Sequence, residues 1–198
     1  PCKYAFYKMI NIEIWASGSG TNADVLMQHF SGVDDIAIVS MGCNRRDAGV
    51  FDIAKRNHIP STYWSKSNWN ADTILKELAD RQIDYILLAG FLKLVPSEVT
   101  RAYKGKIVNI HPSVLPAYGG KEMYGDHVHN AVLANNEEST GITIHEVNEE
   151  FDKGKVIAQY TTLLSPTKET LDSIKSKIQL LEHTNFAPTV DAWIRSKT

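Results

Sequence analysis

The chain has 198 residues, of which 43% are hydrophobic and 22% are charged, a balance that is normal for one globular domain with a full core. Its formal net charge of −2 at pH 7 argues against a general nucleic-acid or membrane-surface binder. No apolar run approaches the roughly 20 residues that a membrane span needs. We therefore expect its partners to be small molecules, with no nucleic acid and no membrane among them.

The two cysteines, Cys2 and Cys43, form neither a metal-ligand spacing nor a disulfide framework. This indicates a reducing compartment, and the cytoplasm by default. Residues 1–8 have neither the long apolar stretch nor the small-residue cleavage site of a signal peptide. We expect them to be a leader outside the fold, with residues 9–198 as a single domain and Met9 as a candidate native start.

The first strand and helix enclose a glycine-rich loop. Residues 10–16 alternate as a β-strand does, residues 23–30 have a helical pattern, and Ser17-Gly18-Ser19-Gly20-Thr21-Asn22 lies between them. Glycines let the backbone approach an anion closely, and the free N–H groups of a helix start favour a phosphate. The letters G-S-G-T-N-A also fit the dinucleotide fingerprint, with Arg45 and Arg46 as candidate 2′-phosphate partners. A turn without a ligand is the third interpretation.

Strands and helices alternate from residue 36 onward. The patterns predict strands at 36–40, 61–63 and 85–89, and helices at 49–57 and 71–81. Such alternation is typical of an α/β fold with a mostly parallel, twisted sheet and helices on both faces. Because ligands of these sheets bind at the carboxyl ends of the strands, the glycine-rich loop and the loop at 90–96 should converge.

Residues 107–111 read as a buried strand that Pro112 ends, because proline fixes φ and disfavours helix in the residue before it. Asn109 and His111 are two residues apart in this strand, so both side chains point to the same side. An amide and an imidazolium can both donate to a carbonyl oxygen that becomes negative, which suits acyl transfer without a covalent enzyme intermediate. The alternative is a turn-capping asparagine beside an ordinary strand-end histidine.

A glycine-rich tract at 117–121 precedes a helix at 126–134 that carries His127 and His129. No cysteine or carboxylate completes a metal-ligand spacing there, so we predict no metal site. Two strands at 141–146 and 156–163 follow. A last helix at 170–194 has apolar residues at helical spacing, and Pro188 is predicted to break or bend it.

Five blocks of the sequence together resemble the glycinamide ribonucleotide transformylases, the folate-dependent formyltransferases of purine synthesis. The resemblance extends from about residue 9 to residue 193. The blocks are Ala16 to Asn22, Leu88-Ala89-Gly90-Phe91, Asn109-Ile110-His111-Pro112-Ser113-x-Leu115-Pro116, Gly141-Ile142-Thr143-Ile144-His145 and Phe151-Asp152-x-Gly154-x-Val156-Ile157.

The resemblance implies a Rossmann-like formyltransferase fold and a set of site residues. Asn109, His111 and Asp152 would be catalytic, and Gly20, Thr21 and Asn22 would hold the substrate phosphate. Leu92, Lys93, Leu94 and Val95 would line the folate pocket with Asn109 and the loop at 147–152, and Glu182 would contact the glycinamide end. The substrates would be glycinamide ribonucleotide and, as formyl donor, 10-formyltetrahydrofolate, with no metal, in a monomer or a homodimer.

In the implied reaction, the substrate amine attacks the formyl carbon and creates an oxyanion. Asn109 and an imidazolium at His111 would stabilise it. Asp152 would raise the basicity of His111 and relay a proton from the amine to the departing N10, directly or through water.

Two segments depart from the family pattern. The loop at 118–125 is longer and richer in glycine, and the segment at 64–70 lacks an arginine that can reach the folate, for which Lys66 or Lys93 could substitute.

Three rival interpretations stay open at this point. One is methionyl-tRNA formyltransferase, for which we would expect an RNA-binding extension and a basic surface, and another is formyltetrahydrofolate hydrolase, for which we would expect an additional N-terminal domain. The third is an NADP-binding Rossmann-type protein, which would use Arg45 and Arg46 but leaves Asn109, His111 and Asp152 unexplained.

Overall fold

The structure, a computed structural model, describes residues 8–165 and 167–197. Its strands are β1 (Ile10–Ala16), β2 (Ile36–Cys43), β3 (Ser61–Tyr63), β4 (Tyr85–Leu88), β5 (Ile107–His111), β6 (Ser139–Glu146) and β7 (Val156–Leu163). Its helices are α1 (Thr21–Phe30), α2 (Val50–Arg56), α3 (Ala71–Asp80), α4 (Ser97–Ala102), α5 (Asp126–Ala134) and α6 (Leu171–Arg195).

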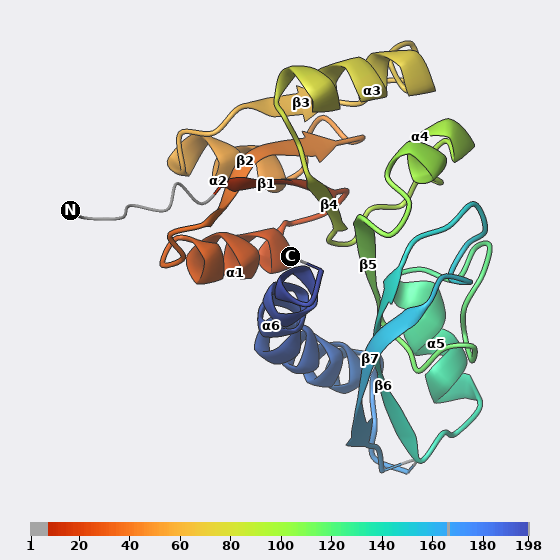
Figure 1. Ribbon diagram of the computed structural model, residues 1–198. Coiled ribbons are helices and arrows are strands. Elements are labelled where there is room, and N and C mark those ends of the chain that lie inside the picture. Colours follow the sequence, from red (N-terminus) through yellow and green to blue (C-terminus); the bar gives the residue numbers. More distant parts are fainter. Residues whose placement is uncertain (1–7, 166, 198) are drawn as a thin grey trace.

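All these strands join one sheet in the order β3-β2-β1-β4-β5-β6-β7 (Figure 1). Strands β1 to β5 pair in parallel, whereas β6 runs antiparallel to both β5 and β7. This confirms the predicted α/β fold with a mostly parallel sheet. The chain builds β2 and β3 on one side of β1 and then places β4 and β5 on the other side. The carboxyl ends of β1 and β4 are therefore neighbours where the strand order reverses, which is the position where open α/β sheets bind ligands.

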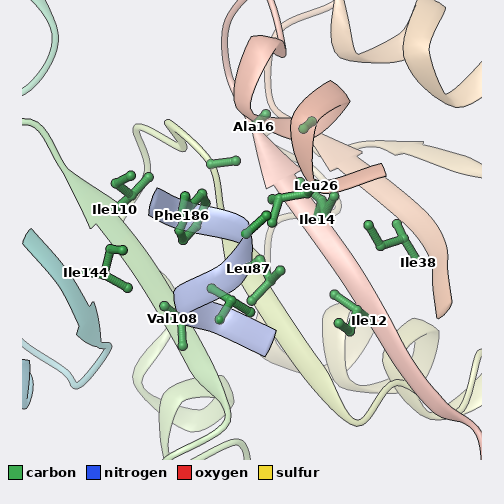
Figure 2. Packing of buried hydrophobic residues seen from close by; sticks show 14 of the residues in the cluster. Ile12, Ile14, Ala16, Leu26, Ile38, Leu87, Val108, Ile110, Ile144 and Phe186 are labelled. Carbon is green, nitrogen blue, oxygen red and sulfur yellow. The ribbon is translucent and has the colours of Figure 1, made fainter. Parts of the chain in front are cut away.

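Helices cover both faces of the sheet (Figure 1). On one face, α1, α2 and α6 bury their apolar residues against inward-facing strand residues such as Ile12 and Ile14. Figure 2 shows Phe186 of α6 among side chains of β4 and β5. On the other face, α3 and α4 pack on a second cluster that includes Trp15 and Ile86. These two apolar layers fix the strands whose ends carry the candidate site.

Two helix predictions need correction. Helix α4 was not predicted, because its six residues are too few to show a helical period. Helix α6 is 25 residues long and includes Pro188, so of the predicted break or bend, the break does not occur. Proline removes only one backbone N–H, and the helix is held on both sides of it by buried residues, among them Phe186 and Val190. None of the helices in the described ranges has the length and apolarity to cross a membrane.

The predicted leader lies largely outside the described residues, which begin at Lys8. Lys8 is exposed and precedes β1, and its Nζ lies 2.8 Å from Asp84 Oδ1. The domain boundary at residue 9 stays a prediction.

Candidate active site

A cleft of about 590 Å³ lies at the carboxyl ends of β1, β4 and β5. The loops that follow these three strands and the loop between β6 and β7 contribute to its lining. Every predicted site residue lines this cleft: Gly20, Thr21, Asn22, Leu92, Lys93, Leu94, Val95, Asn109, His111, Asp152 and Glu182. The structure thus brings together residues that are up to 162 positions apart, from Gly20 to Glu182.

His111 and Asp152 face each other across the cleft floor. His111 ends β5 and is only 3% exposed, and its Nδ1 lies 3.5 Å from Asp152 Oδ1. The other ring nitrogen, Nε2, is 2.8 Å from the carbonyl oxygen of Tyr118. Because a carbonyl only accepts hydrogen bonds, Nε2 carries a proton and Nδ1 is the atom directed at the carboxylate. Asp152 also accepts a hydrogen bond of 2.8 Å from the Gly120 backbone N–H.

Burial, the largest influence, lowers the pKa of His111, although the Asp152 carboxylate and the Tyr118 carbonyl act to raise it. Burial therefore favours the neutral form of the His111 imidazole more than it is favoured in an exposed histidine. The imidazolium that we expected at His111 stays a prediction, and burial opposes it because removing a charge from water costs more here than the carboxylate returns. For Asp152, burial acts to raise the pKa, but hydrogen bonding from His145, the charge of His111 and the Gly120 N–H together lower it. The neutral form of His111 thus stands beside a carboxylate, an arrangement in which the base can accept a proton.

His145 belongs to the same cluster and was not among the predicted site residues. It lies on β6, directly opposite Asn109 in the antiparallel pair with β5, and is 2% exposed. Its Nε2 is 3.1 Å from Asn109 Nδ2 and 3.6 Å from Asp152 Oδ1, while its Nδ1 is 2.8 Å from the Glu146 carbonyl oxygen. Since Nδ1 donates to that carbonyl, Nε2 is the ring nitrogen that faces both the Asn109 amide and the Asp152 carboxylate. His145 therefore fixes Asn109 with its NH2 group inward, and the second N–H of that group remains for a ligand.

The glycine-rich loop forms one end of the cleft. Gly20 is the N-cap residue of α1 and has a φ of 81°, a left-handed conformation that favours glycine. Ser17, which is 1% exposed, joins this loop to two others: its hydroxyl donates to Asn44 Oδ1 at 2.5 Å and accepts from the Leu92 backbone N–H at 2.9 Å. These hydrogen bonds fix the loop, whose backbone leads into the start of α1. Backbone N–H groups at a helix start are a common binding site for phosphate.

We expect Gly20→Ala to raise the KM for a phosphorylated substrate at least tenfold and to leave the KM for the second substrate within about twofold. A Cβ at this position would lie 2.7 Å from Ile53 Cδ1 and 3.1 Å from Val50 Cα, so the loop must move. Steady-state kinetics with each substrate varied measures the effect. Gly105→Ala is the matched control, because Gly105 also has a positive φ of 67° but lies outside the cleft. Equal changes in both KM values would instead indicate a general folding defect.

Asn22 and Glu182 meet between α1 and α6. Asn22 Nδ2 donates to Glu182 Oε2 at 2.9 Å, and Asn22 Oδ1 is buried without a hydrogen-bond partner in the described structure. Burial raises the pKa of Glu182, although the Asn22 amide acts to lower it. A buried acceptor without a partner is costly, so this corner of the cleft is suited to a ligand that donates hydrogen bonds, such as a sugar hydroxyl or an amide.

The opposite wall of the cleft is apolar. Leu92 and Leu94 are 42% and 44% exposed, and Phe151, on the loop that carries Asp152, is 38% exposed. Val95, which follows Leu94 in the chain and also lines the cleft, is buried. The Lys93 ammonium lies 5.1 Å from the centre of the Trp69 ring. The segment at 64–70, which lacks the expected arginine, therefore contributes a cation–π contact to Lys93. Exposed apolar side chains beside one cation suit a flat aromatic ligand with an acidic end.

No group of three or more histidine, cysteine, aspartate or glutamate side chains within residues 8–165 and 167–197 could hold a metal ion. His129, from the histidine-rich region, is 6% exposed and lines the cleft.

A doubly wound sheet that joins a glycine-rich loop to Asn109, His111, His145 and Asp152 defines an α/β enzyme equipped for acyl transfer. The chain belongs to the formyl transferase family, because a family model of that description matches residues 10–190.

Individual relatives agree with this membership. A chloroplastic phosphoribosylglycinamide formyltransferase from Arabidopsis thaliana is 35% identical over 188 residues, which are 91% of this chain. This chain spans only 64% of that relative's length. The phosphoribosylglycinamide formyltransferase of Bacillus subtilis is 32% identical over 88% of this chain and 90% of its own. The crystal structure of glycinamide ribonucleotide transformylase 1 from Geobacillus kaustophilus is similar with a TM-score of 0.82 and 34% identity, over 91% of this chain and 96% of that one.

Proposed function

We propose that the protein transfers the formyl group of 10-formyltetrahydrofolate to the amine of glycinamide ribonucleotide. The observation that carries the proposal is the cluster of Asn109, His111 and Asp152 between a phosphate-type loop and an apolar wall, in a chain of the formyl transferase family. The names of the relatives from Arabidopsis thaliana and Bacillus subtilis support the choice of acceptor. The formyl donor acts as a co-substrate, and no metal takes part in the proposed steps.

The two ends of the cleft suit the two substrates. The ribonucleotide phosphate lies on the backbone of Gly20, Thr21 and Asn22, and Glu182 receives hydrogen bonds from the remainder of that substrate. The folate pterin and its acidic tail lie along Leu92, Lys93 and Leu94, with Val95 also in the lining. The amine and the formyl carbon then meet above His111, where holding them together removes much of the entropic cost of reaction.

The chemistry proceeds through a tetrahedral intermediate. The amine nitrogen forms a bond to the formyl carbon, and the carbonyl π electrons move to oxygen, which the free N–H of Asn109 stabilises. The neutral His111 takes the amine proton at Nδ1, and the Asp152 carboxylate stabilises the resulting imidazolium. This imidazolium then donates its proton to N10 of the folate while the carbon–N10 bond breaks. The products are the formylated ribonucleotide and tetrahydrofolate.

Each rival function would leave some features of the cleft without a role. An NADP-binding protein would use Arg45 and Arg46, yet the Arg46 guanidinium lies 4.8 Å from the centre of the Tyr63 ring, where it is engaged in a cation–π contact. Such a protein also has no use for Asn109, His111 and Asp152. A formyltetrahydrofolate hydrolase would need no phosphate loop, because water replaces the ribonucleotide.

The test is to mix the protein with glycinamide ribonucleotide and 10-formyltetrahydrofolate and to follow both products. We expect tetrahydrofolate to form only when the ribonucleotide is present. Folate release without the ribonucleotide would indicate a hydrolase, and transfer to methionyl-tRNA would indicate the related formyltransferase. Calorimetric binding of NADPH without any response to folates would favour the reductase class. Cytoplasmic location and the choice between monomer and homodimer stay predictions.

A further inference from the structure

A short segment between the catalytic histidine and α5 contacts both proton-transfer residues through its backbone. The carbonyl of Tyr118 lies 2.8 Å from His111 Nε2, and the N–H of Gly120 donates to Asp152 Oδ2 at 2.8 Å. Gly119 lies between them and is packed closely against Leu115 and beside Asp152, since a Cβ there would be 2.4 Å from Leu115 Cδ2 and 3.4 Å from Asp152 Cβ. Three consecutive residues thus determine how His111 and Asp152 face each other.

The conformation of this segment is unusual and needs to be held in place. Tyr118 has a φ of 55°, which is sterically costly for a residue with a Cβ and persists only where its surroundings impose it. The side chain supplies the restraint. Its hydroxyl donates to Glu137 Oε1 at 2.5 Å and accepts from Asn135 Nδ2 at 2.7 Å, at the carboxyl end of α5. Its ring packs against the main apolar core.

We propose that Tyr118 is a positioning residue for proton transfer, because its anchored phenol holds the 118–120 backbone that fixes the tautomer of His111 and the orientation of Asp152. The inference rests on the proposed function only where it concerns turnover. Tyr118 is not among the residues that line the cleft, so it acts through His111 and not on the substrates.

The consequence for the chemistry follows from the hydrogen-bond donors and acceptors. While the Tyr118 carbonyl accepts from Nε2, the neutral His111 must expose its lone pair at Nδ1, which faces Asp152 Oδ1. If the segment relaxed, the proton could sit on either nitrogen. Part of the population would then direct an N–H at the carboxylate and would have no free base at Nδ1. The anchor therefore keeps all molecules in the form that can accept a proton.

The first test uses Tyr118→Phe, which keeps the ring in the core and removes both hydroxyl contacts. In the unaltered protein, the 15N chemical shifts of the His111 ring, measured without substrates, should indicate a proton on Nε2. In Tyr118→Phe they should indicate a mixture of the two tautomers. In the formyl-transfer assay, kcat should fall about ten- to a hundredfold while both KM values stay within twofold. The tautomer measurement needs no turnover, so a failure of the proposed function would not obscure it.

Matched variants separate positioning from stability. Tyr103→Phe removes a hydrogen bond of 3.0 Å from the Tyr103 hydroxyl to the Ile83 carbonyl, away from the cleft. It should lower the melting temperature without changing the His111 tautomer. Glu137→Gln keeps an acceptor for the phenol and should retain turnover, whereas Glu137→Ala should resemble Tyr118→Phe. If Tyr118→Phe does not fold, the two Glu137 variants carry the test. A wild-type tautomer and wild-type kcat in Tyr118→Phe or Glu137→Ala would overturn the inference.

Discussion

Asp152→Asn is expected to lower turnover by about a hundredfold or more while the melting temperature stays almost unchanged. Asparagine has the same size and tolerates the left-handed conformation that Asp152 adopts, with a φ of 55°. It can also still accept the hydrogen bond from the Gly120 N–H. What disappears is the charge beside His111 Nδ1, and with it the stabilisation of the imidazolium that forms during the reaction.

The pH dependence has a defined sign. Burial already holds the pKa of His111 below its ordinary value, and the Asp152 carboxylate is one of the groups that act to raise it. Removal of that charge should lower the His111 pKa further. The neutral imidazole then persists to more acidic solution, so the acid limb of the kcat profile should move to lower pH. An NMR titration of His111 measures the pKa directly. His145 and His129 are the other titratable groups that influence this cluster.

Asp84→Asn is a suitable control for this prediction. Asp84 also accepts a hydrogen bond from a backbone N–H, that of Asn11 at 3.0 Å, but it directly precedes β4, at the amino end of that strand and outside the cleft. It should change stability without changing turnover. Near-normal turnover and an unmoved His111 titration in Asp152→Asn would show that Asp152 is only a turn residue, and another group would then have to carry the proton.

The second large effect is expected for Asn109→Ala. Loss of one oxyanion donor costs on the order of 3 kcal/mol of transition-state stabilisation, or roughly a hundredfold in kcat. Both KM values should stay within severalfold, because the negative charge exists mainly in the transition state. Steady-state kinetics with saturating substrates measures this loss. Asn11→Ala serves as the control, because it removes a side-chain hydrogen bond of 3.1 Å from Asn11 Nδ2 to the Gln82 carbonyl, outside the cleft. A normal kcat in Asn109→Ala would mean that the oxyanion is stabilised elsewhere.

His145 influences the orientation of the Asn109 amide. Because its Nε2 lies 3.1 Å from Asn109 Nδ2, the orientation of the amide depends on this ring. The dependence explains why an asparagine at the end of a strand can act as a fixed donor although its own side chain is free to rotate about χ2.

The parts of the molecule that were predictable from the sequence depend on local patterns and on general rules of α/β sheets. The loop around Gly20, the loop around Lys93 and the strand end at His111 converge because parallel strands all present their carboxyl ends to one edge. The family resemblance supplied Asp152 and Glu182, which no local pattern would have brought to this edge.

The contributions of His145 and Tyr118 could not be predicted in the same way. His145 reaches Asn109 through an antiparallel register, and 27 residues separate the end of β5 at His111 from the start of β6 at Ser139. A non-glycine residue with positive φ, such as Tyr118, has no clear signal in a sequence either. The one available signal for His145 was its place at the end of the Gly141 to His145 block, where alternation puts it on the same side as Thr143.

The antiparallel ladder between β5 and β6 separates what can vary in this enzyme from what cannot. Residues between His111 and Ser139 can be inserted or lost without moving His145, since the ladder and not the connecting chain sets its position. A single inserted residue within β6 would instead turn every later side chain to the opposite face, and Ile144 would take the place of His145. The segment that covers the cleft can therefore vary in length outside residues 118–120 and their anchors Asn135 and Glu137, while the strand beneath it keeps its length.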